Sequence, residues 1–365
     1  VKIGLLTPNS TYLPQLARSL KRSVEHGFAQ TGSTSHQLEL VIESTQYNAA
    51  GPEVATALQR FGTNHGVDVV VAPLNPGLLH GVLATLTGQD MPLVALTLGE
   101  DLVAVGDAHP RLFVNSFNLW QSAWLSGYTG VQRHGPVAAT ISALHDGGYG
   151  MSMAFALGVQ AAGGTIEHSA LTHLRSVTDD PSETIASVLD GAPNFVMAFE
   201  TGREGSSFLA GWLDHPGSAD MPLVMLPSLG AEAVADRTGP SVASAIGRWT
   251  MQGDTFGAWH QAELTRPANA YSVLAFETGQ MLADIAAHSD GSTASISEAL
   301  TAARCTGPRG AVGLNTPDDQ VQLFQRYEID AVDEQPLQHV RPTRIEVPDA
   351  LSEQATAARE NFEKA

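Results

Sequence analysis

The chain has 365 residues, of which 43% are apolar and 16% charged, a balance typical of a globular protein and not of a disordered one. This length exceeds what one ordinary core supports, so we expect two domains. The net charge of −19 argues against a nucleic-acid partner, because such a surface needs clustered Lys and Arg. The single cysteine, Cys305, excludes a disulfide within the chain and a zinc site built from cysteines.

The start of the chain and its apolar runs bear on where the protein works. No apolar run approaches the ~18 to 20 residues of a membrane span. The chain opens directly on the strand-like VKIGLLT, without a basic start followed by an apolar stretch. We therefore expect either a cytoplasmic protein or one from which a signal peptide has been removed.

Strand-like and helix-like patterns alternate from the N-terminus onward. Residues 1–7 predict a strand, and a helix then starts at Pro14, with apolar residues at every fourth position as far as Phe28. The rest of this first set comprises strands at 38–44, 67–73 and 92–97 and helices around 54–61 and after Gly77. Such alternation predicts right-handed crossovers and an α/β fold with a parallel, doubly wound sheet.

The same order then starts again. The second set comprises strands at 136–144, 165–173, 194–201 and 222–228 and helices at 149–162, 183–191 and 206–214. The pentapeptide DMPLV occurs at 90–94 and again at 220–224, each time as the expected last strand of its set, and each copy runs on to a Leu-Gly pair. The duplication predicts two lobes of similar architecture.

The remainder of the chain does not form a third set. Its expected elements are a strand at 248–256, a long helix at 268–288, a helix at 296–303, a strand at 321–332 and a polar, frayed helix over the last ~16 residues. Helices without a full set of strands complete an earlier lobe, so we expect the chain to cross back.

The motifs of common enzyme and metal sites are missing. The thirteen histidines are scattered and form no HExxH, and neither G-x-S-x-G nor a G-x-G-x-x-G after the first strand occurs. The segment GREGSS at 202–207 lacks the Gly-Lys-Ser/Thr ending of a phosphate loop. We therefore expect no enzymatic activity, no metal and no cofactor.

Several segments in a particular order are similar to those of a known family. They are VKIGLLTPNS, VVVAPLNPG, MPLVALTLGED, LHDGGYGMSMAFALGVQAAGGTI, NFVMAFETG and CTGPRGAVGLN. Over nearly its whole length the chain resembles the type 1 periplasmic solute-binding proteins of ABC importers, in the branched-chain amino-acid-binding branch. The resemblance implies two Rossmann-like lobes joined by three crossovers, with the ligand in the cleft between them.

The resemblance also implies where the lobes divide. Crossovers are expected near Phe117–Leu119, Gln252–Asp254 and Phe324–Arg326. The expected division is 1–117 plus 254–324 for lobe one, 118–253 plus 325–349 for lobe two, and a C-terminal polar tail or helix at 350–365.

Ligands of open parallel sheets sit beyond the carboxyl ends of the strands. The loop after VVVAP would present Asn75 and backbone N–H groups at a helix start, which favour an anionic or carbonyl group. The resemblance implies further contacts from the first lobe and from the second lobe, and Trp120, just past the first expected crossover, is a further candidate. The full expected set is Ser10, Tyr12, Asn75, Thr97, Leu98, Gly99, Trp120, Tyr149, Thr201 and Ser228.

Two positions depart from the family pattern. Amino-acid binders of this branch commonly have an acidic residue where this chain has Ser228 and a tyrosine where it has Thr201. An ammonium buried without a counter-charge is expensive, and strand alternation would point Glu200 to the other side. An amide, a short carboxylate or an aromatic acid therefore stands beside an amino acid as the expected ligand.

The leading expectation is a non-catalytic, periplasmic, monomeric receptor that closes on a small polar or carboxylate-bearing solute and docks on a membrane ABC permease. A cytoplasmic amide- or small-molecule-sensing regulator with the same fold is the alternative. A doubly wound enzyme is the third reading, without a poised acid, base or nucleophile to support it.

Overall fold

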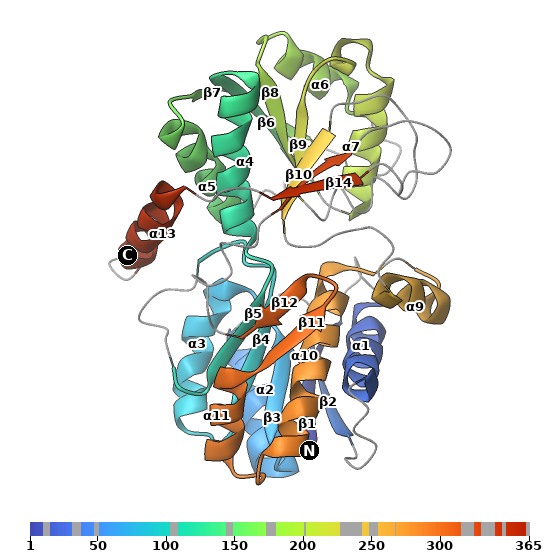
Figure 1. Ribbon diagram of the computed structural model, residues 1–365, viewed down its shortest axis with the longest axis vertical. Helices are drawn as coiled ribbons and strands as arrows, with labels where there is room; N and C mark the ends of the chain where they lie inside the picture. The colour runs from blue at the N-terminus through green and yellow to red at the C-terminus, as the bar shows by residue number, and fades with distance from the viewer. Residues whose placement is uncertain are drawn as a thin grey trace. The chain divides into compact units, whose positions relative to one another are not determined.

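A computed structural model describes residues 1–9, 15–30, 38–46, 51–102, 109–143, 149–172, 180–200, 202–226, 243–247, 255–266, 268–314, 325–329, 340–344 and 348–362. The chain forms two compact units (Figure 1). Unit one comprises Val1–Phe117, Thr255–Pro317 and Arg359–Ala365, and unit two comprises Asn118–Asp254 and Asp318–Ala358. The crossovers expected near 252–254 and 324–326 fall largely outside the described residues, and their positions stay predictions.

The described strands of unit one form a parallel five-stranded sheet in the order β2-β1-β3-β4-β5. They are β1 (Lys2–Asn9), β2 (Glu39–Gln46), β3 (Val69–Pro73), β4 (Leu93–Thr97) and β5 (Leu112–Ser116). The two central strands β3 and β4 are apolar and almost completely buried, as expected for strands covered on both faces.

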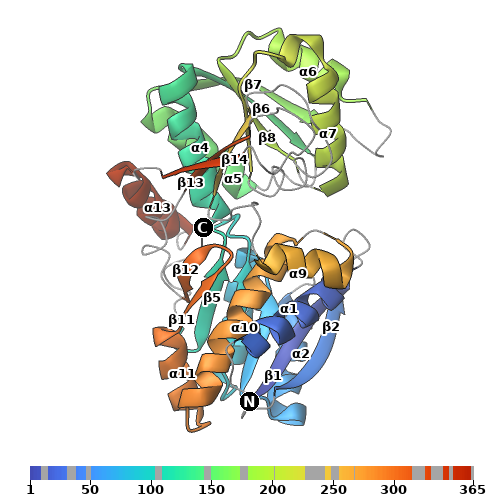
Figure 2. The same cartoon turned by 45° about the vertical axis from the view of Figure 1, so that its right-hand side comes forward.

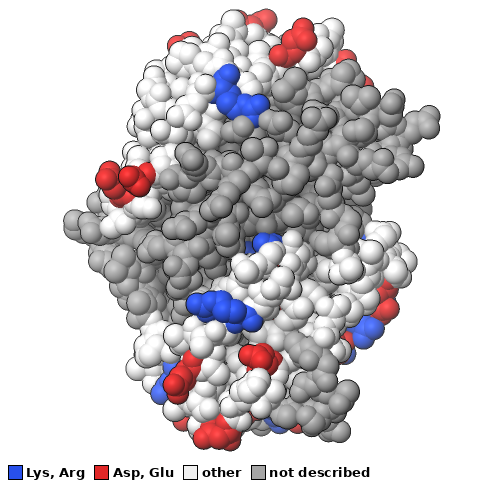
Figure 3. Space-filling model, viewed as in Figure 1, with Lys and Arg blue, Asp and Glu red and all other residues white. Residues whose placement is uncertain are grey.

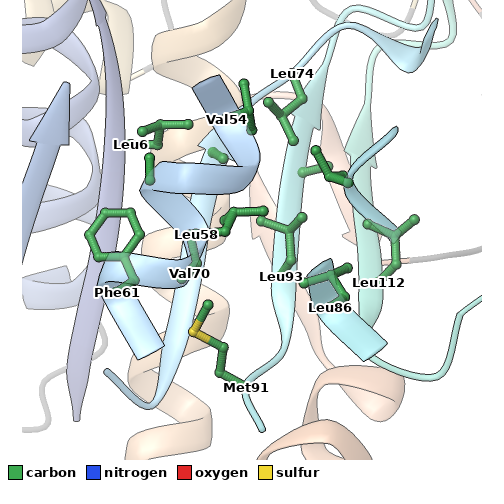
Figure 4. Packing of buried hydrophobic residues seen from close by; sticks show 14 of the residues in the cluster. Leu6, Val54, Leu58, Phe61, Val70, Leu74, Leu86, Met91, Leu93 and Leu112 are labelled. Atoms are coloured by element: carbon green, nitrogen blue, oxygen red, sulfur yellow. The ribbon is translucent and has the colours of Figure 1, made fainter. Parts of the chain in front are cut away.

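Helices cover both faces of this sheet. They are α1 (Leu16–Gln30), α2 (Gly51–Arg60), the π-helical turn η1 (Phe61–His65), α3 (Pro76–Thr87), α9 (Thr255–Leu264), α10 (Ala270–His288) and α11 (Thr293–Ala302). On one face, α2 and α3 enclose an apolar cluster with β3 and β4, part of which Figure 4 shows around Leu58, Val70 and Leu93. The other face carries α1 and α10, which lie side by side (Figures 1 and 2). A hairpin of β11 (Arg304–Gly307) and β12 (Gly310–Gly313) follows α11.

Unit two has a seven-stranded sheet among its described residues, in the order β14-β13-β10-β9-β8-β6-β7. The strands are β6 (Val137–Ala143), β7 (Thr165–Thr172), β8 (Phe195–Phe199), β9 (Leu223–Met225), β10 (Ala243–Gly247), β13 (Gln325–Ile329) and β14 (Val340–Arg344). The first five are parallel, whereas β13 and β14 extend the sheet by antiparallel pairing. The sheet is therefore mixed, with the doubly wound part as predicted.

The helices of unit two surround the parallel part of the sheet. They are α4 (Leu119–His134), α5 (Tyr149–Ala161), α6 (Ser182–Leu189), α7 (Gly202–Asp214) and the 3₁₀ turn η3 (Pro216–Ser218). The C-terminal helix α13 (Asp349–Phe362) belongs to unit two as far as Ala358. An apolar cluster that includes Ile141, Phe208 and Trp212 forms the core beneath α6 and α7.

Each unit contains one pair of helices that pack backbone against backbone through glycines. In unit one, a Cβ on Gly27 of α1 would overlap the Phe276 carbonyl oxygen of α10, and a Cβ on Gly279 of α10 would overlap the Val24 carbonyl oxygen of α1. In unit two, Gly127 of α4 and Gly158 of α5 meet the partner helix in the same reciprocal way. The two units thus share this way of packing helices.

Three sequence-based expectations need correction. Each DMPLV copy begins the next-to-last parallel strand of its sheet and not the last, because β5 follows β4 and β10 follows β9. The strand expected at 248–256 falls largely outside the described residues, and its last two residues begin helix α9 instead. The C-terminal helix is not frayed, because Leu351 is fully buried and Gln354 accepts a hydrogen bond from Trp124 Nε1 at 2.6 Å.

Candidate ligand-binding site

The carboxyl ends of β3 and β4 bring several predicted site residues to one edge of the unit-one sheet. The two strands pair in register from Val70 and Leu93 to Pro73 and Leu96, and the Leu74 N–H extends the ladder to the Leu96 carbonyl at 2.9 Å. The loops that follow, 74–75 and 98–102, therefore leave the sheet side by side. This is the edge where parallel sheets of this architecture bind ligands.

Asn75 caps helix α3. Its Oδ1 accepts a hydrogen bond from the Gly77 N–H at 2.8 Å, and Pro76 occupies the first helical position, where a missing N–H costs nothing. The Asn75 Nδ2 donates to Glu100 Oε1 at 2.7 Å. Both ends of the side-chain amide are thus engaged within unit one, and a ligand contact by Asn75 stays a prediction.

The loop after β4 is braced from within. Thr97 is 1% exposed, and its Oγ1 accepts a hydrogen bond from the Gly99 N–H at 3.0 Å. Gly99 has a φ of 72°, a left-handed conformation that a side chain disfavours, whereas Leu98 is half-buried. The hydroxyl and the N–H that the resemblance assigns to ligand contact therefore bond to each other here.

Glu100 is the functional candidate at this edge that the sequence reasoning missed. Burial, the largest cause, and the neighbouring charge of Asp101 raise the pKa of its carboxyl, the backbone N–H groups of Glu100 and Gly99 lower it, and the resulting pKa is about 7. Oε1 accepts from Asn75, whereas Oε2 is buried and has no hydrogen-bond partner among the described residues. The acid directly after the Thr-Leu-Gly loop was visible in MPLVALTLGED, but its burial was not.

Of the other predicted site residues, the structure describes some and not others. Trp120 lies in the first turn of α4 and is 3% exposed, and Tyr149 begins α5. The remaining four predicted residues lie outside the described part of the chain: Ser10, Tyr12, Thr201 and Ser228. Their ligand contacts stay predictions.

Glu200, considered from the sequence as a counter-charge, is fully buried in unit two. It accepts a hydrogen bond from Thr172 Oγ1 at 2.7 Å. This contact ties the end of β8 to the end of β7, so the residue already has a role inside its own unit.

A second buried charge cluster lies at the end of β5, next to the boundary between the units. Arg309, on the turn of the β11–β12 hairpin, donates from Nε to Glu277 Oε2 at 3.0 Å, and both side chains have no exposed surface. Its two Nη atoms donate to the Ser116 carbonyl and to Asn115 Oδ1, and its guanidinium lies 4.6 Å from the centre of the Phe117 ring. The segment CTGPRG, quoted above only as a family marker, thus carries a residue that holds the last strand of unit one in place.

The described residues contain no group of three or more His, Cys, Asp or Glu side chains that could hold a metal ion. None of the helices in the described ranges is long and apolar enough to cross a membrane. On the described surface seen in Figure 3, Lys and Arg side chains occur singly or in small groups among Asp and Glu. The described part of that face offers no basic field of the kind that nucleic acid requires.

The comparisons with known proteins agree with this architecture. The family model described as "Periplasmic binding protein" matches residues 1–328. No curated protein sequence matches the chain.

Solved structures of solute-binding proteins match nearly the whole chain. A substrate-binding protein of an ABC transporter from Sphaerobacter thermophilus has a TM-score of 0.77 at 17% identity, and the match covers 96% of this chain and 98% of that one. A solute-binding protein from R. palustris in complex with benzoate has a TM-score of 0.70 at 18% identity, covering 94% and 98%. LivJ from Streptococcus pneumoniae in complex with isoleucine has a TM-score of 0.70 at 13% identity, covering 94% and 99%. At these identities the likeness establishes the fold.

Proposed function

The chain belongs to the periplasmic binding protein family, and from that premise we propose that it is the extracytoplasmic receptor of an ABC importer. Its ligand is a small polar or carboxylate-bearing solute, amino-acid-like or related. The receptor is monomeric and periplasmic, catalyses no reaction, and docks on a membrane permease to deliver its cargo.

The observation that carries this proposal is the match of the family model over residues 1–328. The polar edge formed by Asn75, Thr97 and Glu100 supports it, because these groups gather at the carboxyl ends of parallel strands, where such sheets bind small molecules. Two structurally similar proteins hold benzoate and isoleucine, and both of these ligands carry a carboxylate.

The proposed mechanism is closure of unit two over a solute first held by unit one. A ligand shifts an equilibrium between open and closed forms only by its differential affinity for them. The solute must therefore contact both units in the closed form, and rotation takes place in the segments that join the units. Within this proposal, Tyr149, Thr201 and Ser228 are the contacts from unit two.

Thermal shift with a panel of amino acids, amides, short carboxylates and aromatic acids tests the proposal. A true ligand stabilises the folded chain by about 2.7 kcal/mol at a concentration one hundred times its Kd. Small-angle scattering should then give a smaller radius of gyration at saturation. An unchanged radius at saturation contradicts closure, and a panel without any hit contradicts the proposed solute class.

A further inference from the structure

The Glu100 carboxylate has one acceptor atom that none of the described residues uses. Gly77 N–H can only donate, so the oxygen of the Asn75 amide must face it, and the Asn75 NH₂ group must face Glu100. This orientation consumes Glu100 Oε1 as an acceptor. Oε2, which is buried, has no partner among the described residues.

The described surroundings of Glu100 do not neutralise its charge either. No described Lys, Arg or His forms a salt bridge with it, and the neighbouring charge of Asp101 has the same sign. A buried, unpaired anion is expensive, and so is an unsatisfied acceptor. The structure thus tolerates at this edge a group whose missing partner would be a positively charged N–H donor.

Building on the function proposed above, we propose that Glu100 is a specificity-determining residue that accepts a hydrogen bond from a protonated amine of the solute through Oε2. The solute class is then amine-bearing: an amino acid or a related ammonium compound. An ionised carboxylic acid without an amine gains nothing from Glu100 and is repelled by it once Glu100 is ionised.

This assignment distinguishes carboxylates that carry an amine from carboxylates that do not, whereas the fold alone favours neither as the ligand. Benzoate lacks a nitrogen, whereas isoleucine carries an ammonium group, and proteins of similar structure hold each of them. An ammonium placed against Oε2 would satisfy the acceptor and supply the counter-charge in one contact. A hydrogen bond to a charged partner contributes more than one between neutral groups.

The test uses solutes matched in shape, such as leucine with 4-methylpentanoate and phenylalanine with 3-phenylpropanoate, titrated calorimetrically at pH 8 into the whole chain. We expect the amino acid of the preferred pair to bind at least tenfold more tightly than its partner without the amine. Glu100→Gln should reduce that ratio at least tenfold. The carboxylate that lacks the amine should bind to the variant no more weakly than to the wild type. Circular dichroism confirms that the variant is folded.

Glu43→Gln is the matched control, because Glu43 on β2 already pairs with Arg60 at 2.9 Å and with His65 at 3.1 Å. It makes the same chemical change and should leave the ratio within threefold of the original. Equal binding of both members of every pair, or an unchanged ratio in Glu100→Gln, overturns the role of Glu100 while leaving a solute receptor intact. Binding of neither member, with no other hit in the wider panel, overturns the proposed function as well.

Discussion

Unit one contains two carboxylates that the fold treats in opposite ways. Glu277 shares both oxygens with Arg309, in a cluster that also holds Asn115 and the Ser116 carbonyl. Glu100 has the Asn75 amide as the side-chain partner of one oxygen, and its other oxygen has no hydrogen-bond partner among the described residues. The paired cluster is best understood as structure, because its two charges are paired and each guanidinium nitrogen of Arg309 donates a hydrogen bond, whereas the Glu100 site keeps an acceptor atom that no described residue uses.

The largest expected effect comes from breaking the paired cluster. Arg309→Met should lower the free energy of unfolding by about 3 to 5 kcal/mol, because Glu277 stays buried without its counter-charge. Urea unfolding measures this loss. The double variant Arg309→Met, Glu277→Leu should recover much of it.

The control for this variant is Arg304→Met on the same hairpin. Arg304 is exposed and donates only to backbone carbonyls, at 2.7 Å to Ala303 and 3.3 Å to Thr301. Its loss should change the unfolding free energy by no more than about 0.5 kcal/mol. Equal losses of unfolding free energy in Arg309→Met and Arg304→Met would show that the buried cluster contributes no more to stability than an exposed arginine does.

The next effect is a pH dependence that Glu100 alone should produce. The folded state keeps its proton up to a pKa of about 7, whereas the unfolded chain releases it near 4.5. The folded state therefore binds more protons between these values, and the contribution of Glu100 to stability falls as pH rises from about 4.5 to about 7, by about 3 kcal/mol in all. Glu100→Gln should lack this fall. The unfolding free energy of the variant minus that of the wild type should therefore rise with pH across this window.

A constant difference between wild type and Glu100→Gln from pH 4.5 to 8 would contradict that prediction. It would mean that the Glu100 carboxyl has the same pKa in the folded and the unfolded chain. The contrast between a half-satisfied Glu100 and a fully paired Glu277 would then have no support.

The smallest effect concerns the residue that holds Glu100. Asn75→Ala removes the cap of α3 and should cost about 1 kcal/mol in unfolding free energy. Asn75→Ser keeps an oxygen that can cap the helix and removes only the contact with Glu100. If Asn75→Ser recovers most of the unfolding free energy that Asn75→Ala loses, the helix cap accounts for most of the stabilisation by Asn75. A serine variant as unstable as the alanine variant would instead assign the stability to the pair with Glu100.

The strands of both sheets could be predicted where apolar runs are continuous, as in VVVAP and LVALT. Strand β5 was missed because Asn115 interrupts its apolar pattern. That residue is fully buried, and its Nδ2 donates to Leu274 O and Thr278 Oγ1, both on α10 and both at 3.1 Å. Only a tertiary partner distant in sequence makes a polar residue suitable there. Helix α4 was missed for a related reason, because burial on nearly all sides leaves no amphipathic stripe.

The candidate site was predictable in position but not in detail. The end of β3 and the start of α3 were readable from the Asn-Pro-Gly sequence, and the structure places Asn75 there as the cap. The pairing of Asn75 with Glu100 and the pairing of Glu277 with Arg309 join residues 25 and 32 positions apart in the sequence. No periodicity links such positions, because their meeting depends on strand order and on a hairpin that folds back over α10.

The glycine contacts between α1 and α10 and between α4 and α5 have a practical consequence for observing the protein at work. At the glycines, where the helices touch through their backbones, no side chain can rearrange to change their distance, so each pair should keep its internal spacing whatever the solution contains. The distance between two spectroscopic labels on the two helices of one such pair should therefore not change when solute is added. The distance between labels on α1 and α5 would report any motion of one unit against the other, with the labelled helix pairs as the reference.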